Sequence, residues 1–195
     1  MNTLESEQAV IPAQLMQISQ DVAAVCGDIV RKTAILIKGR QYIRVEGWQA
    51  LATAHGCIAG SRAVEKTETG FRAIGELRRI SDGVLLAIAE GFVGVDELVW
   101  FGGMDQSGKV WPARHEYAIR AMASTRAISH VCRSAFAHVV VLIDAELSTT
   151  PAEEMDQNDM SPKKSLRDDV NRQLQEAAAA RRREKPLSHE GTLHH

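Results

Sequence analysis

Hydrophobic positions in the first third of the chain change period twice, which predicts a helix, a strand and a second helix. Apolar residues recur every three or four positions over 12–27, a spacing that predicts a helix. The continuous run TAILIK at 33–38 predicts a short strand, which Gly39 and Arg40 would turn. Helical spacing then returns from Val45 to His55 and predicts a second helix. We expect this helix to end at Gly56, because glycine is typical of a helix C-cap. The expected buried positions are Leu15, Ile18, Val22, Val25 and Ile29 in the first helix and Val45, Trp48, Leu51, Ala52 and His55 in the second.

Three extended runs follow, at about 57–67, 71–80 and 84–95. Thr69-Gly70 separates the first two, and Asp82-Gly83, a strong hairpin signal, separates the last two. The pattern predicts an antiparallel meander of three strands. Because such a meander has two edges with unpaired backbone groups, we expect the 33–38 strand to cover one edge and a neighbouring subunit to pair with the other.

A glycine-rich loop is predicted over 95–112, and a long helix over roughly 114–140. One side of this helix is apolar, with Ile128, Val131, Cys132, Ala135, Phe136 and Val139. The opposite side carries a row of cations, Arg126, His130 and Arg133, flanked by the small residues Ala123, Ala127 and Ala137. We refer to Arg126, His130 and Arg133 as the cation row. Because the apolar side would pack on the sheet, the row either faces solvent or binds an anion.

The order of elements predicts an α+β domain, in which the meander packs on the long helix and a mobile C-terminal tail follows. We divide the chain into an N-terminal helical segment (1–28), a core (29–147) and a flexible, partly helical charged tail (148–195). Large apolar residues become rare after the core, so the tail has little surface to bury. His194 and His195, at its end, are not expected to bind metal.

The composition limits the location and the partners of the protein. The 195 residues are 45% hydrophobic, which is enough for a core, and no apolar run reaches the length of a membrane span. The first residues lack the apolar region of a signal peptide, so we expect a cytoplasmic protein. Cys26, Cys57 and Cys132 are therefore expected to be buried free thiols. The net charge is −2, so any binding of phosphate requires positive charge concentrated on one surface.

Signals for catalysis are few, and we expect neither an enzyme nor a cofactor. The sequence has no GxSxG, no P-loop, no CxxC and no GxGxxG after a strand, and QSGK at 106–109 lacks most of a Walker A loop. His130 and Cys132 lie two residues apart on a helix and point to different sides. Glu90, Asp96 and Glu97 are the candidates for a metal site, although exposed polar positions explain them as well.

Basic residues are better organised than acidic ones along the core. Glu116 is the only acidic residue between 113 and 143, so the long helix is locally cationic. Cations around a hairpin and a helix suit a groove that follows a phosphate backbone, and solvated strand faces are the alternative. The candidate DNA-binding residues are Lys38, Arg40, Arg44, Arg62, Lys66, Arg72, Arg120, Arg126, His130 and Arg133.

Several segments, in order, resemble the Rad52-like single-strand annealing proteins, including short phage versions. The segments are YIRVEGWQALATAHG, GFRAIGELRRISDG, AEG and EYAIRAMASTRAISHVCRSAFAHVVVL. The matching positions are Tyr42, Glu46, Gly47 and Trp48, then Ala121 or Ala123, Thr125, Arg133 and Ser134. The resemblance covers about residues 30–143.

The resemblance implies a β-β-β-α core that assembles into rings or helical filaments, binds single-stranded DNA and anneals complementary strands without ATP. In the family, basic residues on the long helix line a groove, and Arg133 matches one such position. A Lys-Arg pair of eukaryotic members falls at Ser129-His130, where Arg126 would replace some of the charge.

The preferred function is therefore annealing in recombination and repair, as a homo-oligomer without a cofactor, in the cytoplasm of a bacterial host if the protein is phage-encoded. A host single-strand-binding protein is a further candidate partner, through the tail. The alternatives are a mediator or adaptor that binds a recombinase or a single-strand-binding protein without annealing, and a metal-dependent nuclease that uses Glu90 and its neighbours.

Overall fold

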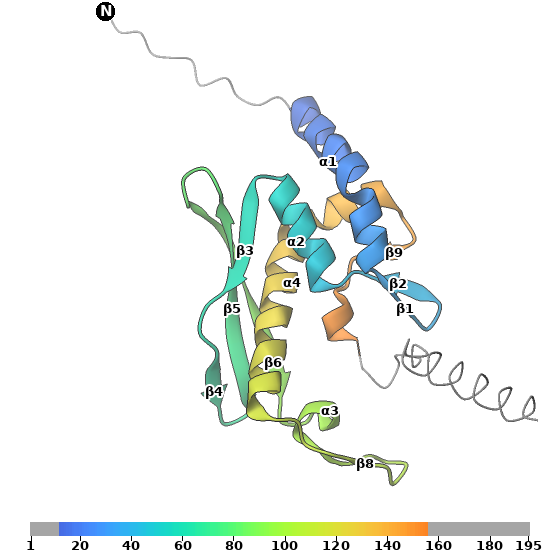
Figure 1. The fold of residues 1–195 in the computed structure, drawn as a ribbon, viewed down its shortest axis with the longest axis vertical. Coiled ribbons are helices and arrows are strands. Elements are labelled where there is room, and N and C mark those ends of the chain that lie inside the picture. Colours follow the sequence, from blue (N-terminus) through green and yellow to red (C-terminus); the bar gives the residue numbers. More distant parts are fainter. Residues whose placement is uncertain (1–11, 156–195) are drawn as a thin grey trace, which may run out of the picture. The chain divides into compact units, whose positions relative to one another are not determined.

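The structure, a computed structural model, describes residues 12–155 and is mixed α+β (Figure 1). The helices are α1 (Pro12–Thr33), α2 (Val45–Ala54), α3 (Leu98–Phe101) and α4 (Glu116–Ile143), with a 3-10 turn, η1 (Ala152–Glu154). The strands are β1 (Ile35–Ile37), β2 (Arg40–Tyr42), β3 (Cys57–Ser61), β4 (Glu65–Thr67), β5 (Gly70–Arg79), β6 (Leu85–Gly94), β7 (Gly103–Met104), β8 (Val110–Trp111) and β9 (Leu147–Ser148).

The predicted meander and long helix are confirmed, with shifted ends. β5 is the centre of a four-stranded antiparallel sheet, which β6 flanks on one side and β3 and β4 flank on the other. The single strand expected over 57–67 is therefore two short strands, and both pair with β5. The hairpin between β5 and β6 turns at Gly83, which has a positive φ of 73°.

Helix α4 packs closely on this sheet because small residues line both surfaces. A Cβ added at Gly75 or Gly91 would lie less than 3 Å from backbone atoms of Ala127. Ala123 and Ala127 are fully buried there, so they face the sheet. The expectation that these two alanines flank the cation row on an open surface is therefore wrong.

Larger side chains form two core clusters, one on each side of this close contact. One cluster joins Leu77 on the sheet with Val131 and Phe136 on α4, and also includes Trp48 and Val30 from α2 and α1. The other joins Phe71, Val93, Trp100 and Ile119. Cys26, Cys57 and Cys132 are buried free thiols, as predicted.

Helix α1 is longer than predicted and buries a different side. Four of its five expected core positions, Leu15, Ile18, Val25 and Ile29, are exposed, and only Val22 is buried. Its buried side consists of small residues and two valines, Ser19, Val22, Ala23, Cys26, Gly27 and Val30. Small side chains let α1 approach its neighbours closely, and this approach rather than the apolar stripe determines which side is buried.

The 33–38 strand does not cover the meander, contrary to expectation. Strand β1 forms a hairpin with β2 through Lys38 and Gly39, both with positive φ, and β2 pairs with β9 in parallel. These three strands are a separate small sheet. The strand β2 and its hairpin lie where the sequence predicted only a turn.

The predicted 95–112 loop contains α3 and a short hairpin of β7 and β8. Asp105 accepts hydrogen bonds from the Ser107 hydroxyl and the Trp111 indole, and these hold its pKa at about 2. Lys109 lies over the Trp111 ring, 3.5 Å from its centroid. The hairpin is therefore fixed by one carboxylate and one aromatic ring.

Residues 148–155, assigned to the tail in the sequence analysis, pack against the core. Ala152 is buried in a cluster with Ile35 and Ile37, and its N–H donates to the carbonyl of Ile43 at 2.9 Å. The packed core therefore extends beyond the boundary expected at residue 147. Residues 156–195 lie outside the described part, and with them the predicted tail helix and the terminal histidines.

Within the described residues, α4 is the one helix with the length and hydropathy of a membrane span. The central helix of a core meets the same criteria, and α4 packs on the sheet and on α2.

Candidate functional site

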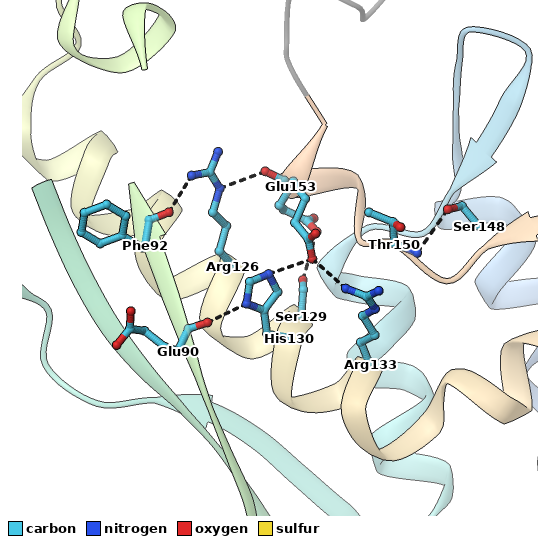
Figure 2. A network of polar contacts seen from close by, with 10 residues as sticks. Glu90, Phe92, Arg126, Ser129, His130, Arg133, Ser148, Thr150 and Glu153 are labelled. Carbon is cyan, nitrogen blue, oxygen red and sulfur yellow. Dashed lines mark hydrogen bonds and ion pairs between the residues drawn. The ribbon is translucent and has the colours of Figure 1, made fainter. Parts of the chain in front are cut away.

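A cleft of about 740 Å³ lies beside α4 and contains part of the cation row. It is bounded by the end of β6, by α3 and by the segment 151–155, which includes η1. Arg126 and His130 are in its lining, and Figure 2 shows them with Arg133 on the same helix. The remaining lining consists of Glu90, Phe92, Asp96, Glu97, Leu98, Val99, Trp100, Glu153, Glu154 and Met155.

Arg126 is a structural residue at the inner end of the row, with its side chain only 13% exposed. Its guanidinium donates to both carboxylate oxygens of Glu97 at 2.6 Å. It also donates to the carbonyl oxygens of Phe92 at 2.6 Å and of Glu153 at 3.0 Å. Arg126 therefore joins three segments of the chain, and its donors are largely committed to the protein itself.

His130 and Arg126 together cover part of the outer edge of β6. His130 Nδ1 donates to the carbonyl of Glu90 at 2.6 Å, two residues before the carbonyl that Arg126 binds. Four residues along a helix advance about 6 Å, and two residues along a strand advance nearly 7 Å, so the spacings match. This part of the edge is thus protected from pairing with another strand.

Glu154 is the carboxylate that neutralises the outer part of the row. Its Oε1 lies 2.8 Å from His130 Nε2 and 3.5 Å from Arg133 Nη1. The contact with His130 is at ion-pair distance without the alignment of a hydrogen bond. Both ring nitrogens of His130 therefore face oxygen atoms of the protein. The Arg133 side chain is 42% exposed, and that of His130 is 31% exposed.

Glu153, next to Glu154, has a different role at the start of α2. The residue before this helix, Arg44, provides no side-chain cap, and the N–H of Val45 donates instead to Glu153 Oε1 at 2.8 Å. Ser129 of α4, which is fully buried, donates its hydroxyl to Glu153 Oε2 at 3.0 Å. Burial raises the pKa of Glu153. The carboxylate therefore caps α2 and joins it to α4.

The four candidate cations on the sheet and at the start of α4 do not extend the cation row. Each is exposed or half-exposed and is paired with a carboxylate. Arg62 pairs with Glu76, Lys66 and Arg120 with Glu116, and Arg72 with Glu65 and, at 3.7 Å, with Glu90. Arg120 also donates to the carbonyl of Val64 at 2.7 Å.

The three cations near the first hairpin are exposed on another part of the surface. Lys38 lies in the β1–β2 turn, and Arg40 borders a hollow with Asp144 and Glu146. Arg44 immediately precedes α2, the helix that Glu153 caps. The ten candidate residues therefore do not form one groove, and the row on α4 is the part that the fold brings together with a cleft.

Carboxylates outnumber basic side chains in the lining of the cleft. Glu90, Asp96, Glu97, Glu153 and Glu154 all line it. Among the described residues, no group of three His, Cys, Asp or Glu side chains is placed to hold a metal ion. Both oxygens of Glu97 are occupied by Arg126. The described geometry therefore provides no support for the nuclease alternative.

The acidic partners of the cation row were not predicted from the sequence. The sequence predicts Glu97 as a metal ligand or an exposed polar residue, and Glu153 and Glu154 as part of the tail. These glutamates lie at least twenty positions from Arg126, His130 and Arg133, so no local pattern indicated the contacts. The available signal was the scarcity of acids on α4, since partly buried cations need partners from elsewhere.

In comparisons with known proteins, no family model, no curated protein and no solved structure matches the chain.

Proposed function

We propose that the protein binds single-stranded DNA along α4 and anneals complementary strands without ATP, as a homo-oligomer. The observation that carries this proposal is the placement of His130 and Arg133. His130 lines the cleft, Arg133 follows it about one turn along α4, and Glu154 is the carboxylate that both contact. A phosphodiester, like a carboxylate, has oxygens that share one negative charge, so it would suit the same two cations.

Each part of the cation row has its own role in this proposal. Arg126 fixes the site by joining α4 to Glu97 and to the 151–155 segment. His130 and Arg133 hold the phosphate backbone, so that the bases face outward and can pair with a second strand. The α+β arrangement is compatible with the Rad52-like β-β-β-α core that the sequence resembles, and we propose membership of that family on the resemblance.

Repetition of a weak site in an oligomer would compensate for the small number of cations in each chain. Contacts that are weak individually add along one DNA strand when neighbouring subunits hold it together. This reasoning suits a chain of net charge −2 with a local row of cations. Assembly into a ring or a filament is therefore part of the proposal.

Fluorescence anisotropy of a labelled oligonucleotide tests the site. Arg133→Ala should weaken binding by about 1–3 kcal/mol, the usual loss for a charge-assisted hydrogen bond, while far-UV circular dichroism stays unchanged. Affinity should also fall with salt, because phosphate contacts release counterions. Binding that depends neither on Arg133 nor on salt would refute the proposed site.

The acidic lining of the cleft favours one alternative, an adaptor that binds a basic segment of another recombination protein. Five carboxylates face the cleft, so a peptide rich in lysine and arginine would be attracted to it. The same titration with such a peptide distinguishes the two functions. Tight binding of the peptide, together with no binding of the oligonucleotide, would favour the adaptor.

A further inference from the structure

We infer that Glu154 occupies the phosphate site of the free protein, and that a DNA phosphate binds His130 and Arg133 by displacing it. This inference rests on the proposed function and specifies how the site is controlled. A single carboxylate oxygen, Glu154 Oε1, is within 4 Å of both cations. The carboxylate thus stands where a non-bridging phosphate oxygen would bind.

The two neighbouring glutamates differ in how firmly they are held. Glu153 accepts hydrogen bonds from Val45 and Ser129 and is partly buried, so its removal would expose the start of α2. The Glu154 side chain contacts only His130 and Arg133 among the interactions found in the described residues, and as a whole residue it is exposed. The displaceable carboxylate is therefore Glu154, and Glu153 stays in place.

The backbone around Glu154 allows it to leave without disrupting the core. Pro151 and Ala152 are buried, and Ala152 is anchored to Ile43. After them the segment is a single 3-10 turn, in which the N–H of Met155 donates to the carbonyl of Ala152 at 3.2 Å. Opening this last turn would allow the Glu154 side chain to leave α4, while Ala152 stays bonded to Ile43 and the Glu153 carbonyl stays bonded to Arg126.

Displacement would also change the charge of the cleft. With Glu154 in place the cleft lining is rich in carboxylates, and the field at His130 and Arg133 is unfavourable for DNA. Without it the lining has one carboxylate fewer, and His130 and Arg133 lose the carboxylate that both contact. The 151–155 segment thus lowers the affinity of each subunit for anions, and only a strand held by several subunits competes effectively with it.

Oligonucleotide affinity of full-length Glu154→Gln tests this inference against Glu68→Gln. Glu68 is exposed and lies between β4 and β5, and its replacement by glutamine changes the net charge by the same amount. Glu154→Gln should tighten binding about fivefold or more, whereas Glu68→Gln should change it less than about twofold. The gain should shrink in the double variant Glu154→Gln, Arg133→Ala, because the carboxylate acts in part through Arg133 and in part through His130.

Hydrogen exchange provides the second readout. Saturating oligonucleotide should remove the protection of the Met155 amide, while the Val45 amide, bonded to Glu153, stays protected. One outcome would contradict the displacement but leave the DNA site in place. In that outcome the wild type binds DNA, Glu154→Gln has the same affinity as Glu68→Gln, and the Met155 amide stays protected. If neither the wild type nor Glu154→Gln binds DNA, the proposed function is wrong and the displacement fails with it.

Discussion

Arg126 on α4 and Glu97 at the start of α3 form a bidentate ion pair in which both N···O distances are 2.6 Å. The arginine side chain is 13% exposed and that of the glutamate is 30% exposed. Glu97 also accepts a hydrogen bond from the N–H of Gly94, at the end of β6. This pair therefore joins the long helix to the turn that follows the sheet. It also makes the role of Arg126 different from that of His130 and Arg133, whose side chains are more exposed.

Arg126→Ala should lower the free energy of unfolding by about 2–4 kcal/mol, because Glu97 and the carbonyl of Phe92 lose a largely buried donor. Arg133→Ala, on the same helix, should change stability by less than about 1 kcal/mol, because its ion pair is exposed. Urea unfolding of both variants provides the measurement. Equal stability of the two variants would show that Arg126 is not a structural residue.

Gly75 and Gly91 should each be intolerant of a side chain, because α4 leaves no room for one. Gly75→Ala or Gly91→Ala should destabilise the fold by about 1–3 kcal/mol or more, since the obstacle is backbone of Ala127 rather than a flexible side chain. Gly60→Ala is the control, because a Cβ there meets nothing within 4 Å. Thermal unfolding of the three variants measures the difference, and a Gly91→Ala variant as stable as Gly60→Ala would contradict the close packing.

Glu153→Ala should destabilise the protein by about 1–3 kcal/mol, because the Val45 N–H and the Ser129 hydroxyl lose their acceptor. Glu153→Gln should cost less, since an amide oxygen can still accept. The pH dependence follows from the direction of the shift. Burial raises the pKa of Glu153, so the native state holds this proton more tightly than the unfolded state.

The stability of the wild type relative to Glu153→Gln should therefore be highest at low pH and should fall as the pH rises through the raised pKa. Urea unfolding of both proteins from about pH 4 to about pH 7 tests the sign. A relative stability that rises with pH over this range would mean that hydrogen bonds to the carboxylate outweigh its burial.

The secondary structure of the core could be predicted from the sequence where one pattern ran long enough. The extended runs over 71–80 and 84–95 and the hairpin signal at Asp82-Gly83 predicted β5 and β6, and helical spacing predicted α4. The buried side of α1 could not be predicted this way. Its apolar stripe lies mostly outside the surface that its neighbours cover, and only the tertiary packing of small residues shows which side is buried.

Only the cations of the site were predicted from the sequence, and their acidic partners were not. The cations of α4 were visible as a row, but their partners belong to α3 and to the 151–155 segment, which the sequence analysis treated as loop and tail. The same three positions therefore looked equivalent in the sequence. In the structure they differ, since Arg126 is committed to Glu97 and Arg133 is not.

The assembly should depend on the sheet face that points away from α4. Ile58 is 61% exposed and Ile88 62% exposed on this face, and the outer edges of β3 and β4 have no further strand among the described residues. The wild type should sediment as a species larger than a dimer at micromolar concentration or with a long oligonucleotide. Ile88→Glu should shift it to smaller species.

Val110→Glu is the control for this change, because Val110 is 72% exposed on β8, away from the sheet. Sedimentation velocity over a concentration series compares the three proteins. A wild type that stays monomeric in every condition would exclude the ring or filament and the annealing mechanism that depends on it.

The most direct test of the central claim is the annealing rate of complementary labelled oligonucleotides, followed by energy transfer without ATP and without metal. The full-length protein should accelerate annealing over the spontaneous rate, Arg133→Ala should lose most of the acceleration at the same protein concentration, and Glu68→Gln should retain it. No acceleration by the wild type, or an acceleration that Arg133→Ala retains in full, would contradict single-strand annealing along α4.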